Sequence, residues 1–270
     1  MKLHKTILLA VLSCLLASCR YIDYHPYDVD VTGPRNVNGN NMVLIETQCR
    51  GADTIIFAAT GDTQGWYDET KDFVADVNKN HPEVMFVVHT GDLTDYGTLH
   101  EFEWQRNLLG ALKVPYVCDL GNHDCLGTGK ESFEAIFGKP NFSFIAGNVK
   151  FVNINTNALE YDYSEAVPDL DYIEKQVTER DSIFSRTIVT MHAKPFSDVF
   201  NNNVANAFEH HYLAELPGLM FCLNGHDHTL GQHDLFGDGL IYFQTASIDK
   251  RQYYIFTITP SGYSYEVVSF

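Results

Sequence analysis

The sequence predicts an α/β fold, in which parallel strands alternate with helices. Short apolar runs typical of buried strands are separated by segments whose apolar residues recur at helical spacing. Each run ends in a corner of small and polar residues. With 45% hydrophobic and 13% aromatic residues, the chain can build a full core. We therefore expect a single α/β domain over residues 42–270.

The first residues predict a lipoprotein signal peptide over residues 1–18. Lys2 and Lys5 form a positive start, and residues 6–16 are an apolar stretch too short for a typical membrane span. The tetrapeptide Leu-Ala-Ser-Cys that ends at Cys19 resembles the lipobox of bacterial lipoproteins. This resemblance implies cleavage before Cys19, a lipid on its sulfur, and anchoring to a membrane in the bacterial cell envelope. Ordinary secretory cleavage beside an incidental cysteine is the alternative.

Residues 19–41 are polar and predict a tether between the lipid and the domain. Residues 42–47 form either a short helix or a strand. The net charge of −17 becomes −19 once Lys2 and Lys5 are removed, so nonspecific binding of nucleic acid is not expected. The four cysteines of the domain can form a disulfide or remain buried thiols: Cys49, Cys118, Cys125 and Cys222.

Three strand-loop-helix units open the domain. Their apolar runs predict strands over residues 54–59, 84–89 and 114–120. Helices are expected over residues 68–79 and from Thr98, a capping residue, to Leu112. Units of this kind imply parallel strands joined by right-handed crossovers, with the polar loops at one edge of the sheet.

The second half of the domain mixes hairpins with further units of the same kind. Strands are expected over residues 142–145, 150–155, 186–191, 219–223, 240–245, 253–259 and 263–268. Helices are expected over residues 132–137 and 169–179, and after a polar loop within residues 201–216. Turns at Gly147-Asn148 and around Gly262 predict hairpins. The pattern shows no internal repeat and no second domain boundary.

Five corners that follow predicted strands carry Asp, His or a neutral amide. They hold Asp62 and Gln64; Asp92 and Asp95; Asn122, His123 and Asp124; His192; and His226 and His228. Oxygen and imidazole donors of this kind bind hard-to-borderline divalent metals. Since the ends of parallel strands meet at one edge, these side chains should converge.

Two of these corners, at His123 and at His226, allow more specific expectations. His123 can carry a proton near neutral pH, and Asp124 can hold its imidazole in one tautomer. His226 and His228 would point to opposite faces of an extended strand. Both reach one centre only if the backbone bends after Gly225.

In combination these corners resemble the motifs of the calcineurin-like metallophosphoesterase superfamily. The motifs appear in order as Asp-x-Gln, Gly-Asp-x-x-Asp, Gly-Asn-His-Asp, a lone His and Gly-His-x-His, and they cover about residues 54–250. The resemblance implies a four-layer sandwich of two mainly mixed β-sheets flanked by helices. It also implies a centre of two divalent metal ions at the C-terminal ends of the strands.

Roles for the metal ligands follow from the resemblance, position by position. Asp62 and His228 would bind the first metal, and the carboxylate of Asp92 would bridge both. The second metal would be held by Asn122, His192 and His226. Many family members have His where this chain has Gln64, and an amide oxygen is a harder and weaker ligand than imidazole. Either Gln64 still binds or the first metal is held without it, so we expect Mn²⁺ or Mg²⁺ in preference to Zn²⁺ or Fe.

The resemblance also assigns the residues that act on substrate. His123 would not bind metal; it would face the substrate and protonate the leaving group, or contact the phosphoryl oxygens, with Asp124 fixing its orientation. Asp95 would support the site from behind the ligands. Water bound by two metals ionises near pH 7 and would attack a phosphomonoester or a phosphodiester.

A second reading keeps the metals without efficient catalysis. It is a lipid-anchored binding protein for a phosphorylated or glycan ligand, and a purely structural metal domain is a third. The His123-Asp124 pair favours the enzyme, because neither residue is needed to hold metal, whereas Gln64 favours the binding protein. His210, His211 and His233 are interpreted as helix-surface or turn residues, and residues 200–206 as a candidate pocket wall. The substrate and the oligomeric state stay open.

Overall fold

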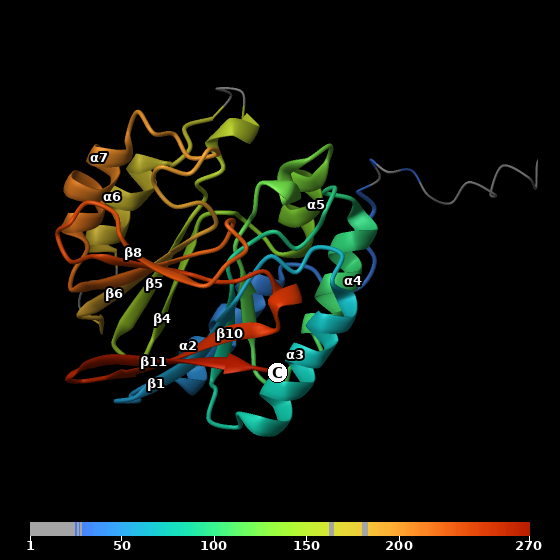
Figure 1. The fold of residues 1–270 in the computed structure, drawn as a ribbon, viewed down its shortest axis with the longest axis horizontal. Helices are drawn as coiled ribbons and strands as arrows, with labels where there is room; N and C mark the ends of the chain where they lie inside the picture. Colours follow the sequence, from blue (N-terminus) through green and yellow to red (C-terminus); the bar gives the residue numbers. More distant parts are fainter. Residues whose placement is uncertain (1–24, 26, 28, 162–164, 180–182) are drawn as a thin grey trace, which may run out of the picture.

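The fold was analysed in a computed structural model that describes residues 25, 27, 29–161, 165–179 and 183–270 (Figure 1). The expected signal peptide and Cys19 lie outside the described residues. Within the described part of the chain, no helix combines the length and the hydropathy that crossing a membrane requires.

The described strands form two mixed sheets, as the sequence predicts. The first sheet has the order β11-β10-β1-β2-β3 and the second the order β4-β5-β6-β7-β9-β8. In the first sheet the bounds are β1 (Ile55–Thr60), β2 (Phe86–His89), β3 (Tyr116–Cys118), β10 (Gln252–Thr259) and β11 (Gly262–Ser269). In the second they are β4 (Phe142–Ala146), β5 (Val149–Ile154), β6 (Arg186–Met191), β7 (Leu219–Asn224), β8 (Gly231–Asp234) and β9 (Ile241–Gln244). Strands β1, β2 and β3 are parallel, and so are β5, β6, β7 and β9.

Helices cover the outer face of each sheet, with α3, α4 and α5 on one side and α6 and α7 on the other (Figure 1). Their bounds are α2 (Val37–Gln48), α3 (Tyr67–Asn80), α4 (Leu99–Leu109), α5 (Gly129–Ile136), α6 (Leu170–Thr178) and α7 (Ala205–Ala207). The capping function expected of Thr98 is confirmed, since its hydroxyl donates to the Glu101 carboxylate at 2.7 Å and its N–H does so at 3.0 Å. The molecule is therefore the α/β/β/α sandwich that the sequence predicts.

The alternation of side chains along β1 builds two of the three core layers. Ala58 packs with the helices α3 and α4, whereas Phe57 and Ala59 lie between the sheets. The Phe57 ring stacks on Phe86 of its own sheet at 5.3 Å between centroids. It meets Phe151 of the other sheet edge-on at 5.1 Å. This aromatic layer joins the two sheets and fixes the strand ends next to one another.

The predicted tether over residues 19–41 extends too far, because its last residues belong to helix α2. Its first residues fall inside the range 19–41, yet Asn38 is buried, and its amide both donates to the Cys118 carbonyl at 2.8 Å and accepts from the Cys118 N–H at 2.9 Å. Glu46, on the same helix, accepts from the N–H of Ile145 in β4 at 3.0 Å. The helix thus covers one edge strand of each sheet, β3 and β4. The Asn-rich sequence is polar and therefore predicts a linker. Its amides instead pair with the backbone of an edge strand, a contact that no local sequence pattern reveals.

Two other features depart from the sequence-based expectations. Strand β8 was not predicted, because its Gly-Gln-His-Asp sequence is polar and it lies at the edge of the sheet. The helix expected within residues 201–216 is irregular: α7 continues as a π-helix (Phe208–Tyr212) and a 3₁₀-helix (Leu213–Glu215). The four cysteines of the described residues are free thiols, which resolves the open question about a disulfide.

Candidate metal centre

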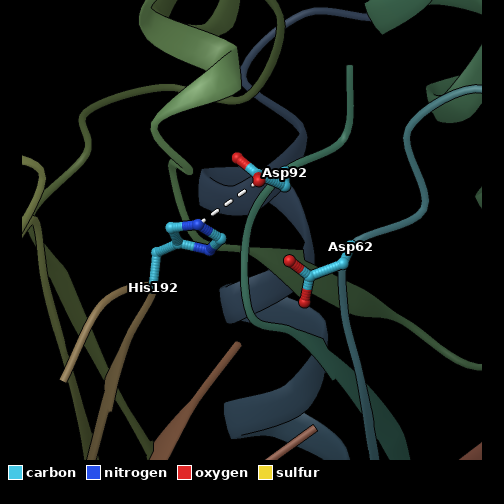
Figure 2. Close-up of side chains that lie close together, drawn as sticks. All are labelled: Asp62, Asp92 and His192. Atoms are coloured by element: carbon cyan, nitrogen blue, oxygen red, sulfur yellow. Dashed lines mark ion pairs between the residues drawn. The ribbon is translucent and has the colours of Figure 1, made fainter. Parts of the chain in front are cut away.

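Three donor side chains, each following a different strand, converge where the C-terminal strand ends of the two sheets meet (Figure 2). Asp62 follows β1, Asp92 follows β2 and His192 directly follows β6. One ligand atom from each lies within 4.8 Å of the other two, and all three residues are buried. Elements far apart in the sequence therefore present two carboxylates and one imidazole to the same point.

The remaining predicted ligands surround this group. The Asn122 amide oxygen lies 2.9 Å from His192 Nε2 and 3.0 Å from His226 Nδ1. His228 Nε2 lies 3.5 Å from an oxygen of Asp62. The two histidines after β7 thus both reach the centre, as the bend expected after Gly225 requires.

Unusual backbone conformations aim the side chains. Positive φ angles, uncommon for residues with a Cβ, occur at Asp62 (50°), Gln64 (35°), Asp92 (56°), His226 (76°) and His228 (60°). Glycines allow the loops to approach one another. A Cβ on Gly121 would lie 2.1 Å from the Asp92 backbone nitrogen, and one on Gly225 would lie 2.7 Å from the Asp62 carboxylate. Strain of this kind concentrates at functional sites and is maintained by the surrounding packing.

The charges of the cluster are strongly coupled. Burial raises the pKa of Asp62 well above its usual value, and the charge of Asp92 adds to this effect. Burial alone would lower the pKa of His192, but the adjacent Asp92 carboxylate more than offsets it and raises the pKa to about 10. Two buried carboxylates side by side repel each other, so the cluster favours a bound cation.

The donor set fits divalent cations. His192 Nδ1 lies 2.8 Å from the Thr90 carbonyl, which can only accept, so Nδ1 carries the proton and Nε2 faces the cluster. The Asn122 oxygen and the Asp92 carboxylate share that side, with Asp92 3.4 Å from Nε2. Carboxylate, imidazole and neutral amide ligands at a buried site are those of Mn²⁺, Zn²⁺ or Fe²⁺.

The residues expected to act on substrate lie beside the cluster, with one correction. His123 donates its backbone N–H to Asp92 at 3.0 Å, and its Nδ1 lies 2.8 Å from the backbone carbonyl of Asp95. Asp124 does not orient His123 as expected. Its buried carboxylate accepts from the N–H groups of Leu93, Thr94 and Gly121. The tautomer of His123 is instead set by Asp95, through a main-chain atom that no sequence motif can identify, while Asp124 fixes the loop that carries Asp92.

Gln64 lies against the centre as well. Its Nε2 is 3.5 Å from an Asp92 oxygen, and its backbone carbonyl accepts from Gln105 at 2.7 Å. Replacing Gln64 with His is expected to shift the metal preference toward Zn²⁺, because imidazole is the softer ligand. Metal affinity measured across a series of divalent ions checks this, and an unchanged order of metals would contradict it.

Two residues near the centre were not predicted. The Asp198 carboxylate lies 2.8 Å from His226 Nε2, so it can orient that ring. Lys194 binds both Asp227 and the Gln244 amide oxygen, the latter at 2.7 Å. Asp198 also lines a cavity of about 600 Å³ together with Phe200 and residues 201–203, part of the candidate pocket wall. Asp198 lies outside the strand-end corners, and Lys194 shares the corner of His192 but is not a metal-ligand type, so no sequence signal marked them.

A buried carboxyl next to the centre predicts a pH effect on stability. Burial raises the pKa of Asp119 from 3.8 to about 8, although Thr190 donates to it at 3.3 Å. The folded protein therefore binds a proton that the unfolded chain releases, so stability falls as the pH rises from about 4 to about 8. In metal-free protein, Asp119→Asn should remove this contribution, up to about 1.4 kcal/mol per pH unit. Urea unfolding at pH 5 and pH 8 measures it. A pH dependence equal to that of an exposed control, Asp53→Asn, would argue against a protonated Asp119.

Comparisons with known proteins agree with this geometry. A sequence profile described as calcineurin-like phosphoesterase matches residues 55–230. A probable cyclic nucleotide phosphodiesterase of Rhodopseudomonas palustris is 34% identical over 64 residues, which is 24% of this chain and 22% of that protein. A 3',5'-cyclic-nucleotide phosphodiesterase of Nostoc sp. is 27% identical over 118 residues, 43% of each chain. The matches thus span less than half the length of these curated relatives.

Solved structures share the fold. A dimetal phosphatase from Danio rerio has a TM-score of 0.59 and 14% sequence identity, over 80% of this chain and 98% of that one. At this identity the likeness concerns the arrangement of sheets and helices alone.

Proposed function

This chain belongs to the calcineurin-like phosphoesterase family, and on that premise we propose that it hydrolyses phosphodiesters at a centre of two divalent metal ions. Membership makes it a hydrolase of phosphoester bonds. The observation that carries the proposal is the buried convergence of Asp62, Asp92 and His192 within 4.8 Å, with Asn122 and two further histidines around them.

The residues divide into two groups around Asp92, which would be shared. Asp62 and His228 stand on one side, and Gln64 lies against Asp92 itself. Asn122, His192 and His226 stand on the other side. When bound, the two cations would supply positive charge for the phosphate and make water acidic enough to attack near pH 7. We propose Mn²⁺ as the native metal, because amide and carboxylate oxygens make up much of the ligand set.

His123 is the proposed proton donor. The Asp95 carbonyl 2.8 Å from Nδ1 holds the ring in one orientation and leaves Nε2 free to exchange a proton with the leaving alkoxide. The backbone N–H of His123 donates a hydrogen bond to the Asp92 carboxylate, which fixes the position of His123 relative to the centre of the site. Proton donor and metal ligand therefore keep a fixed separation.

We propose a cyclic nucleotide as the substrate. The two curated relatives carry names with this activity. The cavity of about 600 Å³ is of a size suited to a nucleoside-sized group. Asp198 lies between the cavity and the metal centre, since it lines the cavity and contacts His226 of the centre. The side-chain amides of Asn201 and Asn203 offer donors and acceptors to the edge of a base, whereas that of Asn202 already accepts from the Phe196 N–H and donates to the Ser197 carbonyl.

The test compares 3',5'-cyclic AMP, 3',5'-cyclic GMP, bis-p-nitrophenyl phosphate and p-nitrophenyl phosphate in the presence of Mn²⁺. We expect the diesters to be hydrolysed and the cyclic nucleotides to have the lowest KM. Turnover of the monoester alone would make the protein a phosphomonoesterase. No turnover of any of the four, with metal bound, would favour the binding protein of weak catalytic activity.

We further propose that the protein is anchored in the bacterial cell envelope by lipid on Cys19. The support is the Leu-Ala-Ser-Cys box at the end of an apolar stretch. Metabolic labelling with a radioactive fatty acid tests it: the wild-type chain should be labelled, and Cys19→Ser should not. Equal labelling of both would contradict the proposal.

A further inference from the structure

A second group of metal-binding side chains lies outside the centre described above. Glu209 and His210 belong to the π-helix that continues α7, and Asp238 lies in the loop between β8 and β9. This is the part of the molecule around α7 and β8 in Figure 1. One ligand atom from each residue lies within 4.8 Å of the other two. We propose that these three residues bind a single divalent transition-metal ion, with Zn²⁺ as the best fit.

The Glu209 carboxylate is the strongest indication of a ligand. The residue is 2% exposed, and its Oε2 accepts from the Tyr242 hydroxyl at 2.5 Å. Its Oε1 is buried, and no donor group among the described residues hydrogen-bonds to it. A buried carboxylate oxygen left in this state costs free energy, which a cation would recover.

The charges around Glu209 also favour a bound cation. Burial raises the pKa of Glu209 to about 7, and the charge and direct contact of the Asp238 carboxyl and the charge of Asp234 contribute to the rise. His210 Nδ1 lies 3.9 Å from an Asp238 oxygen, so the imidazole faces the carboxylates. Its ring packs on Phe236 at 5.0 Å between centroids, and this contact limits its rotation. A cation would offset the repulsion between the acidic groups.

The loop that carries Asp238 is held by its own hydrogen bonds. Asp234 accepts from the N–H groups of Gly237 at 2.8 Å and of Gly239 at 3.2 Å. Asp238 Oδ1 accepts from the Leu240 N–H at 3.0 Å, which leaves Oδ2 on the side of His210. Asp234 thus positions the loop, and Asp238 supplies the ligand.

Access and ligand type favour Zn²⁺ over Ca²⁺ or Mg²⁺. The side chains of His210 and Asp238 are 46% and 43% exposed, and Glu209 and Asp238 line a cavity of about 310 Å³. Two carboxylates and one imidazole, with space for water as the fourth ligand, match a tetrahedral zinc site. Ca²⁺ prefers six to eight oxygen ligands, and Mg²⁺ retains most of its water.

The competing account needs no metal: Glu209 and Asp238 could share one proton. The experiment that separates the two accounts counts bound metal. Full-length protein is dialysed to equilibrium against ZnCl₂ and analysed for metal per chain. The variants are Asp238→Asn and His210→Ala, which change exposed side chains, and His211→Ala, an exposed neighbour on the same helix that is not part of the group.

We expect Asp238→Asn and His210→Ala each to bind about one Zn²⁺ fewer per chain than the parent and His211→Ala to bind the same number as the parent. Phosphoesterase activity should be that of the parent in all three variants, because none of them changes the first centre. Zn²⁺ should also raise the Tm of the parent by more than that of Asp238→Asn. Equal zinc content in the parent and Asp238→Asn would overturn the proposal in favour of the shared proton. A loss of zinc in His211→Ala as well would overturn it by showing that the loss does not depend on the three ligands.

Discussion

Asp92→Ala is expected to abolish both metal binding and turnover. Asp92 accepts from the His123 backbone at 3.0 Å, lies 3.4 Å from His192 Nε2 and shares the donor cluster with Asp62. Its removal takes away the one carboxylate common to both proposed metal positions and leaves His192 without its charge partner. We expect a loss of at least about 10³-fold in kcat/KM, which corresponds to several kcal/mol of charge stabilisation.

Metal content by elemental analysis and hydrolysis of bis-p-nitrophenyl phosphate measure the two effects together. Asp68→Ala is the matched control, because this exposed carboxylate lies six residues after Asp62 and outside the donor cluster. An Asp92→Ala protein that kept its full metal content would show that the shared position has been assigned to the wrong residue.

His123→Ala should separate catalysis from metal binding. The ring is held by the Asp95 carbonyl at 2.8 Å and does not belong to the cluster of Asp62, Asp92 and His192. We expect metal content to be unchanged and kcat to fall by about 10²–10⁴-fold, the range for loss of a general acid. The fall should be smaller for a substrate whose leaving group is p-nitrophenolate, because such a weak base needs little protonation.

The comparison of leaving groups gives this prediction its sharpest test. An equal loss on cyclic AMP and on the nitrophenyl diester would indicate that His123 binds the phosphoryl group rather than protonating the leaving oxygen. His100→Ala is the control, since His100 is a partly exposed histidine on α4 that contacts Glu103. Release of metal from His123→Ala would show that the ring is a ligand.

Much of the centre could be predicted because local patterns encode it. An apolar run followed by Gly and Asp indicates both a strand and the turn that aims a carboxylate, and Asp62 and Asp92 follow β1 and β2 in this way. The parallel order of β1, β2 and β3 then brings the corners together, as expected.

Other features depend on contacts that sequence spacing does not record. Asp124 follows His123 directly, yet its carboxylate accepts a hydrogen bond from the N–H of Leu93 in another loop. Asp198 reaches His226 from a segment without any recognisable motif. His210 is exposed on a helix, as the sequence predicts, but only the fold brings it to Asp238.

Helix α2 also determines which sheet edges are open to pairing with another chain. This one helix covers an edge strand of each sheet, through Asn38 on β3 and Glu46 on β4. A proteolytic cut shortly before Met42 would release the first of these contacts. The freed edge of β3 would then offer unpaired main-chain groups to another copy of the chain, which is how fibrillar aggregates begin. Of the two edges of each sheet, helix α2 therefore keeps those at β3 and β4 from pairing of this kind.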